Sequence, residues 1–268
     1  MIFTRRFGTP GALPTLMAHC FLGHSGAWQG LVDAMQTSVD ALVFDMPGHG
    51  RSTAPTPPQD LHAAVSELIT GFVTQPSLMI GHSFGGAAVL RHALHHPATA
   101  RGLVLIEPVF FAAARGTPEY AAYLVEQRAM DAALATGDLA QAVRLFLAQN
   151  PGSPDFDTLP VPAQDLLMTQ IRLHEAGNAG ILGDSGHLLA PGLMEGFAPP
   201  VLILLGSATA PLFRATAEGL SRRLPNARIA VVEGAGHMLP ISHPQATADL
   251  VEAWLHETRL HETGQSVA

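Results

Sequence analysis

A serine between two glycines, placed where an apolar run gives way to a helical pattern, constrains this chain more than any other feature. The pentapeptide Gly81-His82-Ser83-Phe84-Gly85 follows the apolar run Ser77–Ile80 and precedes the helix-like run Gly86–Leu90. A turn this tight strains its central residue, and a Cβ at either glycine would collide with neighbouring backbone. It also sets the serine oxygen beside the unpaired N–H groups of a helix N-terminus. The pattern predicts a nucleophile at Ser83; the alternative is a glycine-rich turn that contains a serine by chance.

Short apolar runs alternate with helical patterns along most of the chain, which is typical of βαβ units and a parallel sheet. We expect strands at Ile2–Phe7, Thr15–Ala18, Ala41–Phe44, Leu78–Gly81, Gly102–Ile106, Val201–Leu205 and Arg228–Val232. Helices are expected at Ala27–Met35, Leu61–Thr74, Phe84–His95, Pro211–Leu224 and Pro244–His256. The expected fold class is therefore α/β, with helices that flank a mostly parallel sheet.

The alternation is interrupted between residues 111 and 199, where the pattern predicts helices alone. These helices are expected at Pro118–Thr136, Leu139–Gln149 and Ala163–Ala176. Because the segment lies between two strands of one sheet, we interpret residues 111–199 as a helical cap (lid) inserted into a core domain of residues 1–110 and 200–268. Its side chains are mainly Ala, Leu, Met and Phe, which favours an apolar substrate group beneath it.

The composition limits the partners of this chain. With 47% hydrophobic and 13% charged residues, it can bury a large core. A formal net charge of -8 argues against nucleic acid and anionic membranes as partners, because both call for a basic patch. The single cysteine, Cys20, fits a reducing cytoplasm, and neither a signal-like segment nor an apolar run of about 18 residues is present. We expect a cytoplasmic monomer or homodimer that acts on a small-molecule substrate.

Polar residues follow several of the expected strands at the point where each strand ends. They are His19, Asp45, Ser83, Glu107 and His237. In an open parallel sheet, ligands bind at the edge where the carboxyl ends of the strands meet. The sequence therefore predicts that a serine, a histidine and a carboxylate come together at that edge.

Four segments, in this order, resemble those of α/β-hydrolase-fold enzymes. They are the loop His19-Cys20-Phe21, the segment Asp45–Ser52, the turn Gly81–Gly85, and Gly236-His237-Met238-Leu239-Pro240 before a terminal helix. The resemblance covers nearly the whole chain outside the cap. It implies an α/β-hydrolase fold with Ser83 as the nucleophile and His237 as its base. It also implies an oxyanion hole formed by the backbone N–H groups of Phe21 and Phe84.

The acid departs from the commonest pattern of that family, which has an aspartate a few residues after the strand Val201–Leu205. Thr209 stands about where that aspartate would be, in a loop without carboxylates. Glu107 lies at the end of the next strand after Ser83, 24 residues beyond it, and haloalkane dehalogenases of the family take their acid from that strand end. We therefore predict that Glu107 pairs with His237, with capping of backbone groups as the alternative role. The rival acids are Asp184, Glu218 and Glu233.

We expect neither a metal nor a cofactor. His92 and His96 lie four residues apart, but a third ligand, a His-Glu-x-x-His pattern and a glycine-rich phosphate loop are missing. The expected activity is a cofactor-independent serine hydrolase for a small, apolar carboxylic ester, thioester or lactone. One alternative is a carbon–carbon bond hydrolase or a menaquinone-pathway-like lyase, with Arg91, Arg128 or Arg172 binding a carboxylate. The other is a ligand-binding homologue without catalysis.

Overall fold

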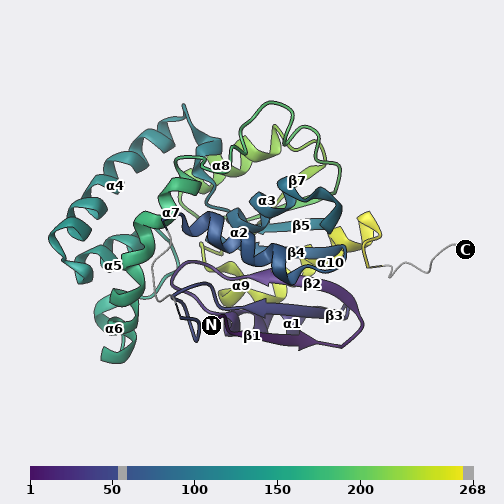
Figure 1. The fold of residues 1–268 in the computed structure, drawn as a ribbon, viewed down its shortest axis with the longest axis horizontal. Helices are drawn as coiled ribbons and strands as arrows, with labels where there is room; N and C mark the ends of the chain where they lie inside the picture. Colours follow the sequence, from purple (N-terminus) through teal and green to yellow (C-terminus); the bar gives the residue numbers. More distant parts are fainter. Residues whose placement is uncertain (54–58, 262–268) are drawn as a thin grey trace, which may run out of the picture.

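The computed structural model describes residues 1–53 and 59–261, which form a seven-stranded sheet with helices on both faces (Figure 1). The strands are β1 (Thr4–Gly8), β2 (Leu13–Ala18), β3 (Val39–Phe44), β4 (Ser77–His82), β5 (Ala100–Ile106), β6 (Val201–Gly206) and β7 (Ala227–Val232). Their order across the sheet is β1-β3-β2-β4-β5-β6-β7. Strand β1 runs antiparallel to β3, and all other neighbouring pairs are parallel. The predicted α/β class with a mostly parallel sheet is confirmed.

Helices cover both faces of the sheet, which explains why the inner strands β2, β4, β5 and β6 are almost fully buried and largely apolar. In β5, Leu103 and Leu105 belong to the apolar core on one face, whereas Val104 and Ile106 belong to the core on the other. A strand that is buried on both faces has no solvent side on which polar residues could alternate. The first core also receives side chains from α2 (Leu61–Phe72), α3 (Phe84–His95) and α8 (Pro211–Ser221), and the second from α1 (Gln29–Ala34) and α10 (Pro244–Thr258).

Between β5 and β6 the described chain forms helices without strands, on the left of Figure 1. They are η3 (Phe111–Ala114), α4 (Pro118–Thr136), α5 (Leu139–Ala148), η4 (Phe156–Thr158), α6 (Val161–Gln170), η5 (Ile171–Leu173) and α7 (His174–Ile181). Helices α4, α5 and α6 stand clear of the sheet, and α7 returns to pack on α2 (Figure 1). The division into a core domain and a cap stays a prediction, and residues 54–58 and 262–268 of that core domain lie outside the described residues.

Local capping explains why α4 begins and ends where the sequence predicts. The Thr117 Oγ1 accepts a hydrogen bond from the N–H of Tyr120 (3.2 Å), and Pro118 occupies the first helical position, where its missing N–H costs nothing. Gly137 ends the helix at φ 77°, in the left-handed region that glycine adopts without strain. Asp138 then caps α5 through its side chain. Neighbouring residues therefore encode both ends of α4.

One expected helix is wrong, because residues 163–176 do not form a single helix. Helix α6 ends at Gln170, the 3-10 turn η5 follows, and α7 begins at His174. The turn redirects the chain so that α7 lies close against α2: a Cβ on Gly180 would lie only 2.2 Å from the Nδ1 of His62. The expected helix over residues 27–35 likewise begins as a 3-10 turn, η1 (Ser25–Trp28), before α1. The packing of α7 on α2 joins segments far apart in the chain, so it leaves no local sequence pattern that marks the break before α7.

Candidate active site

Ser83 occupies a strained turn between β4 and α3. Its backbone has φ 56° and ψ -116°, and a strained conformation of this kind costs about 1–3 kcal/mol. A Cβ on Gly81 would lie 2.4 Å from the oxygen of Gly85, and a Cβ on Gly85 would lie 2.1 Å from the oxygen of Ala18. The Ser83 N–H donates to the carbonyl of Ile106 in β5 (2.8 Å), which ties the turn to the sheet. The pentapeptide thus forms the tight turn that its glycines predict.

His237 lies in the loop between β7 and α9 (Leu239–Ser242), and both of its backbone groups are anchored. Its N–H donates to the carbonyl of Pro151 (2.7 Å), which belongs to the insertion between β5 and β6. Its carbonyl accepts a hydrogen bond from the Nε2 of His82 (2.8 Å), the residue before Ser83. The imidazole is 3% exposed and packs against the Phe213 ring, with 4.6 Å between the ring centroids. The position of His237 therefore depends on the sheet edge and on the insertion together.

Glu107 is the first residue after β5 and is completely buried, with φ 47°. Its Oε1 accepts a hydrogen bond from the N–H of Gly206 at the end of β6 (2.7 Å). Its Oε2 accepts one from the Thr209 hydroxyl (2.5 Å) and lies 3.3 Å from the Nδ1 of His237. The structure thus brings Glu107 and His237 together. Thr209, at the position where the resemblance expects an aspartate, donates a hydrogen bond to the Glu107 carboxylate.

The rival acids lie elsewhere. Asp184 accepts hydrogen bonds from the N–H groups of Leu188 and Leu189 and so closes its own loop. Glu218 is exposed on α8, and Glu233 is exposed just after β7. Within the described residues, Glu107 is the carboxylate that pairs with the His237 ring.

The link between Ser83 and His237 is open in this structure. Among the described residues, neither the Ser83 Oγ nor the His237 Nε2 has a hydrogen-bond partner. Because Nδ1 faces Glu107, Nε2 is the ring nitrogen left to take a proton. Hydrogen bonds between a nucleophile and its base are often long in enzymes without substrate and shorten when substrate binds. The arrangement is therefore compatible with proton transfer from Ser83 to His237.

The loop after β2 is held in place by His19. The Nδ1 of His19 donates to the carbonyl of Cys20 (2.7 Å), and its Nε2 accepts from the N–H of Met46 (2.9 Å). Burial lowers the pKa of His19 to about 3, so the ring stays neutral and keeps these partners. Among the described residues, the backbone N–H groups of Phe21 in this loop and of Phe84 at the serine turn have no acceptor. Unpaired N–H groups are rare at buried positions, so both are available to a ligand oxygen.

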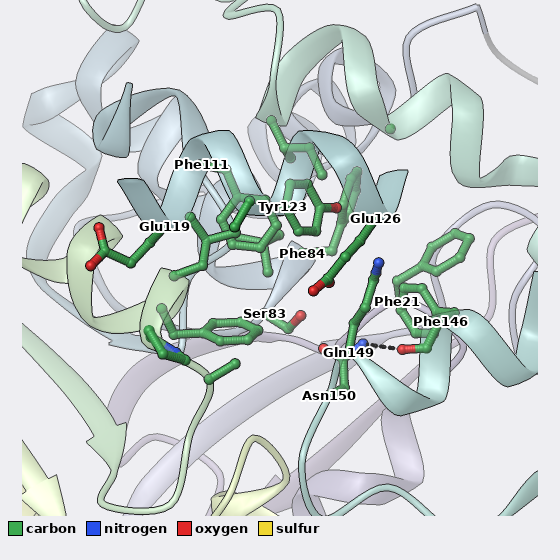
Figure 2. A pocket seen from close by; sticks show the side chains of 18 of the residues that line it. Phe21, Ser83, Phe84, Phe111, Glu119, Tyr123, Glu126, Phe146, Gln149 and Asn150 are labelled. Carbon is green, nitrogen blue, oxygen red and sulfur yellow. Dashed lines mark hydrogen bonds between the residues drawn. The ribbon is translucent and has the colours of Figure 1, made fainter. Parts of the chain in front are cut away.

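A cavity of about 450 Å³ lies between the serine turn and helices α4, α5, α7 and α8, and Figure 2 shows the Ser83 hydroxyl pointing into it. Its wall is largely apolar. The larger apolar side chains are Phe21, Phe84, Val109, Phe111, Phe146, Ile181, Leu212 and Phe213. The polar ones are Ser83, Glu119, Tyr123, Glu126, Gln149, Asn150 and His174. An apolar cavity with a few polar groups suits a small organic ligand.

A sequence model of the alpha/beta hydrolase family matches residues 15–250, from β2 into α10. This chain belongs to the alpha/beta hydrolase family. The match confirms the fold that the four motifs indicate and the expectation that the chain is a hydrolase.

Relatives of this hydrolase include enzymes that act on esters. The pimeloyl-[acyl-carrier protein] methyl ester esterase of Neisseria meningitidis serogroup A is 29% identical over 268 residues, which cover 96% of this chain and 83% of that protein. The (lyso)-N-acylphosphatidylethanolamine lipase of Bos taurus is 33% identical over 102 residues, which cover 35% of this chain and less than a third (30%) of the lipase. A solved haloalkane dehalogenase loop variant from Bradyrhizobium elkanii superposes with a TM-score of 0.71 at 17% identity, covering 98% of this chain and 95% of that one, which shows a shared fold.

Several residues that the sequence connected with ligands lie outside the cavity wall of this hydrolase. Arg91 pairs with Asp60 (3.4 Å), and neither Arg128 nor Arg172 is among the described residues that line the cavity. Cys20 is buried, and burial raises the pKa of its thiol to about 12, so the thiol is not a nucleophile near neutral pH.

Sequence reasoning missed three residues of the site. His82 holds the His237 carbonyl, and its only sequence signal is a place inside the serine pentapeptide. In the sequence Thr209 marks only the absence of an aspartate, whereas the structure shows it as a hydrogen-bond donor to Glu107. His174 lines the cavity from α7, and no motif marks it.

The described part of the chain has no group of three or more His, Cys, Asp or Glu side chains that could hold a metal ion. His92 and His96 stack on each other with 4.9 Å between ring centroids. The nitrogens of His92 contact the hydroxyls of Thr70 (3.1 Å) and Thr99 (3.0 Å). Of the described helices, none has the length and apolar character needed to cross a membrane.

Proposed function

We propose that this hydrolase is a serine esterase in which Ser83, His237 and Glu107 form the catalytic triad and no cofactor takes part. The contact between the His237 Nδ1 and the Glu107 Oε2 carries the proposal, because it joins a buried acid to a histidine at the sheet edge where Ser83 lies. The strained turn at Ser83 also supports catalysis, since backbone strain lowers stability and is found mainly where a functional site uses it.

The proposed reaction gives a separate role to each of these three residues. The Ser83 Oγ attacks the carbonyl carbon of the substrate while the His237 Nε2 takes the hydroxyl proton. Glu107 accepts the hydrogen bond from Nδ1–H, which holds the productive tautomer and stabilises the imidazolium. The N–H groups of Phe21 and Phe84 donate to the oxygen on which negative charge develops. The leaving alcohol or thiol takes the proton from His237 as its bond to the carbonyl carbon breaks. A water deprotonated by the same histidine then attacks the acyl carbon, and the Ser83 Oγ takes that proton back as its bond to the released acid breaks.

The proposed substrate is a small carboxylic ester, thioester or lactone with an apolar acyl group. The apolar cavity wall supports this choice, and so do the relatives whose names state ester or lipid hydrolysis. A lyase that binds a carboxylate finds less support, because no arginine is among the described residues that line the cavity.

A fluorophosphonate probe tests the proposed nucleophile. The folded wild-type protein should become covalently labelled, Ser83→Ala should not, and Ser242→Ala, at an exposed serine, should be labelled like the wild type. Intact-mass spectrometry reads the label, and circular dichroism shows that each variant is folded. An absence of labelling of folded wild-type protein from about pH 6 to about pH 9, where a histidine base is active, would overturn the proposal.

A substrate screen separates the proposed reaction from the alternatives. Esters, thioesters, lactones and vinylogous diketones are offered to the wild type and to Ser83→Ala. Turnover of an ester, thioester or lactone by the wild type alone supports the esterase, whereas turnover of the diketones alone would identify a carbon–carbon bond hydrolase. Tight binding in calorimetry without any product would identify a ligand-binding homologue.

A further inference from the structure

His174, the first residue of α7, is a buried polar side chain in the cavity wall that the proposed reaction does not use. It is 6% exposed, and its ring lies edge-on to those of Phe21 and Phe146, with 6.1 and 5.9 Å between centroids. Among the described residues, neither ring nitrogen has a hydrogen-bond partner. Nδ1 is fully shielded, so Nε2 is the nitrogen that a ligand in the cavity can reach.

A polar group of this kind is costly to bury. Burial lowers the pKa of His174 to about 4, so at neutral pH the ring is uncharged and has one N–H donor and one acceptor nitrogen. The shielded Nδ1 loses its hydrogen bond to water on folding and gains none from the described residues in return, whereas Nε2 stays open to the cavity. The Gln170 Oε1 and the Asn178 Oδ1, four residues to either side, are also buried without partners in the described structure. Gln170 and Asn178 are not among the described residues that line the cavity, whereas the open Nε2 of His174 can be satisfied there by a polar group of the substrate.

The charges around the cavity decide which polar group fits. Glu119 and Glu126 line it, and its described lining residues include no arginine. The chain contains no lysine at all. A carboxylate or phosphate on the substrate would therefore face like charges without a cation to pair with, whereas an uncharged group would not.

We propose that His174 is a specificity-determining residue that hydrogen-bonds a hydroxyl on the acyl chain, so that the hydrolase prefers hydroxyacyl esters to unsubstituted ones. A hydroxyl can accept from Nε2–H or donate to an unprotonated Nε2, whereas a carbonyl can only accept. The Phe21 ring contacts the rings of both His174 and Phe84, at 6.1 and 6.3 Å between centroids. One aromatic ring thus separates His174 from the serine turn, so a hydroxyl that His174 binds would lie close to the ester group. This specificity rests on the esterase activity proposed above.

The test compares nitrophenyl esters of one medium-length acyl chain, either unsubstituted or hydroxylated at successive carbons. The wild type should show a kcat/KM about 10-fold higher for the best hydroxylated ester, which is the size expected of one hydrogen bond to a buried group. His174→Phe should bring that ratio close to unity, and His174→Gln, which keeps a donor and an acceptor, should retain part of it. His256→Phe, the same substitution at an exposed histidine of α10, should match the wild type.

Each outcome either supports or overturns the specificity. Equal ratios in the wild type and His174→Phe, or a preference only for hydroxyls in the leaving alcohol, would overturn it and leave the esterase intact. A wild type that hydrolyses none of the esters and resists the fluorophosphonate would overturn the esterase itself. In that case the affinities of Ser83→Ala for the same esters still test the role of His174. Tighter binding of the hydroxylated ester that disappears in Ser83→Ala/His174→Phe supports this role, and equal affinities for the two esters overturn it.

Discussion

Replacing Glu107 with glutamine should leave the hydrolase folded and remove most of its activity, because the surrounding donors dictate how the new amide sits. The Oε1 of Glu107 accepts from the N–H of Gly206, a backbone donor that cannot rotate. The amide oxygen must take that place, so the NH₂ group faces Thr209 and the His237 Nδ1. The Thr209 hydroxyl can turn to accept, but Nδ1 then has to accept as well, which moves the ring proton to Nε2. A protonated Nε2 cannot take the proton of Ser83.

The size of the effect follows from the cost of the opposite orientation. To restore Nδ1–H, the amide must turn its NH₂ group toward the Gly206 N–H, which leaves two buried donors unpaired. Each unpaired donor costs about 1–3 kcal/mol, so the productive form lies about 2–6 kcal/mol above the unproductive one. At about 1.4 kcal/mol for each factor of ten, kcat should fall by about 30-fold to about 10⁴-fold. KM should change little, because Glu107 does not line the cavity.

The assay measures initial rates on one ester for the wild type and Glu107→Gln, with thermal unfolding of both to verify the fold. Glu218→Gln is the matched control, because it makes the same change at an exposed rival acid on α8 and should retain the wild-type rate. Asp184→Asn tests a second rival acid, which is half-buried, and should also remain active. A Glu107→Gln rate within about threefold of the wild type, or a loss of activity in either control, would refute the reasoning.

Two further predictions concern stability. Burial lowers the pKa of several histidines from 6.5; four of them are His19, with a pKa of about 3, and His49, His62 and His174, each with a pKa of about 4. As the pH falls, these histidines are protonated in the unfolded chain before they are protonated in the folded one. Their contribution to the unfolding free energy is therefore complete above about pH 6.5 and is lost as the pH falls toward 4. Between pH 7 and about pH 5.5 the four histidines together should lower the unfolding free energy by about 5 kcal/mol. Urea unfolding across this range measures the loss, and a flat profile would contradict it. Gly85→Ala should abolish stable folding, because its Cβ would lie 2.1 Å from the Ala18 oxygen. Gly71→Ala, in open space on α2, should instead raise the unfolding free energy by about 0.5–1 kcal/mol. Equal stability of the two variants would show that the serine turn tolerates a side chain.

Short-range chemistry made much of the fold predictable from the sequence. The inner strands β2, β4, β5 and β6 are largely apolar because helices bury both faces of the sheet there, and this requirement marks them directly in the residues. The ends of α4 follow from Thr117 and Gly137, which act on backbone groups within one turn of themselves. The break between α6 and α7 could not be predicted this way, because it depends on the approach of Gly180 to His62, far away in the chain.

Some features of the candidate site likewise follow from the local sequence, and others depend on the tertiary structure. By itself the sequence determined the strained turn at Ser83, since its glycines relieve a clash among neighbouring elements, and it located His237 and Glu107 at strand ends. Only the tertiary structure decided that Glu107 meets His237, that Thr209 donates to the same carboxylate, and that Pro151 anchors the histidine loop. The physical reason is the range of the interactions. Backbone strain and capping act over a few residues, whereas the hydrogen bond between His237 and Glu107 joins residues 130 positions apart in the sequence. The distance between these two side chains depends on how the whole sheet and its insertion pack.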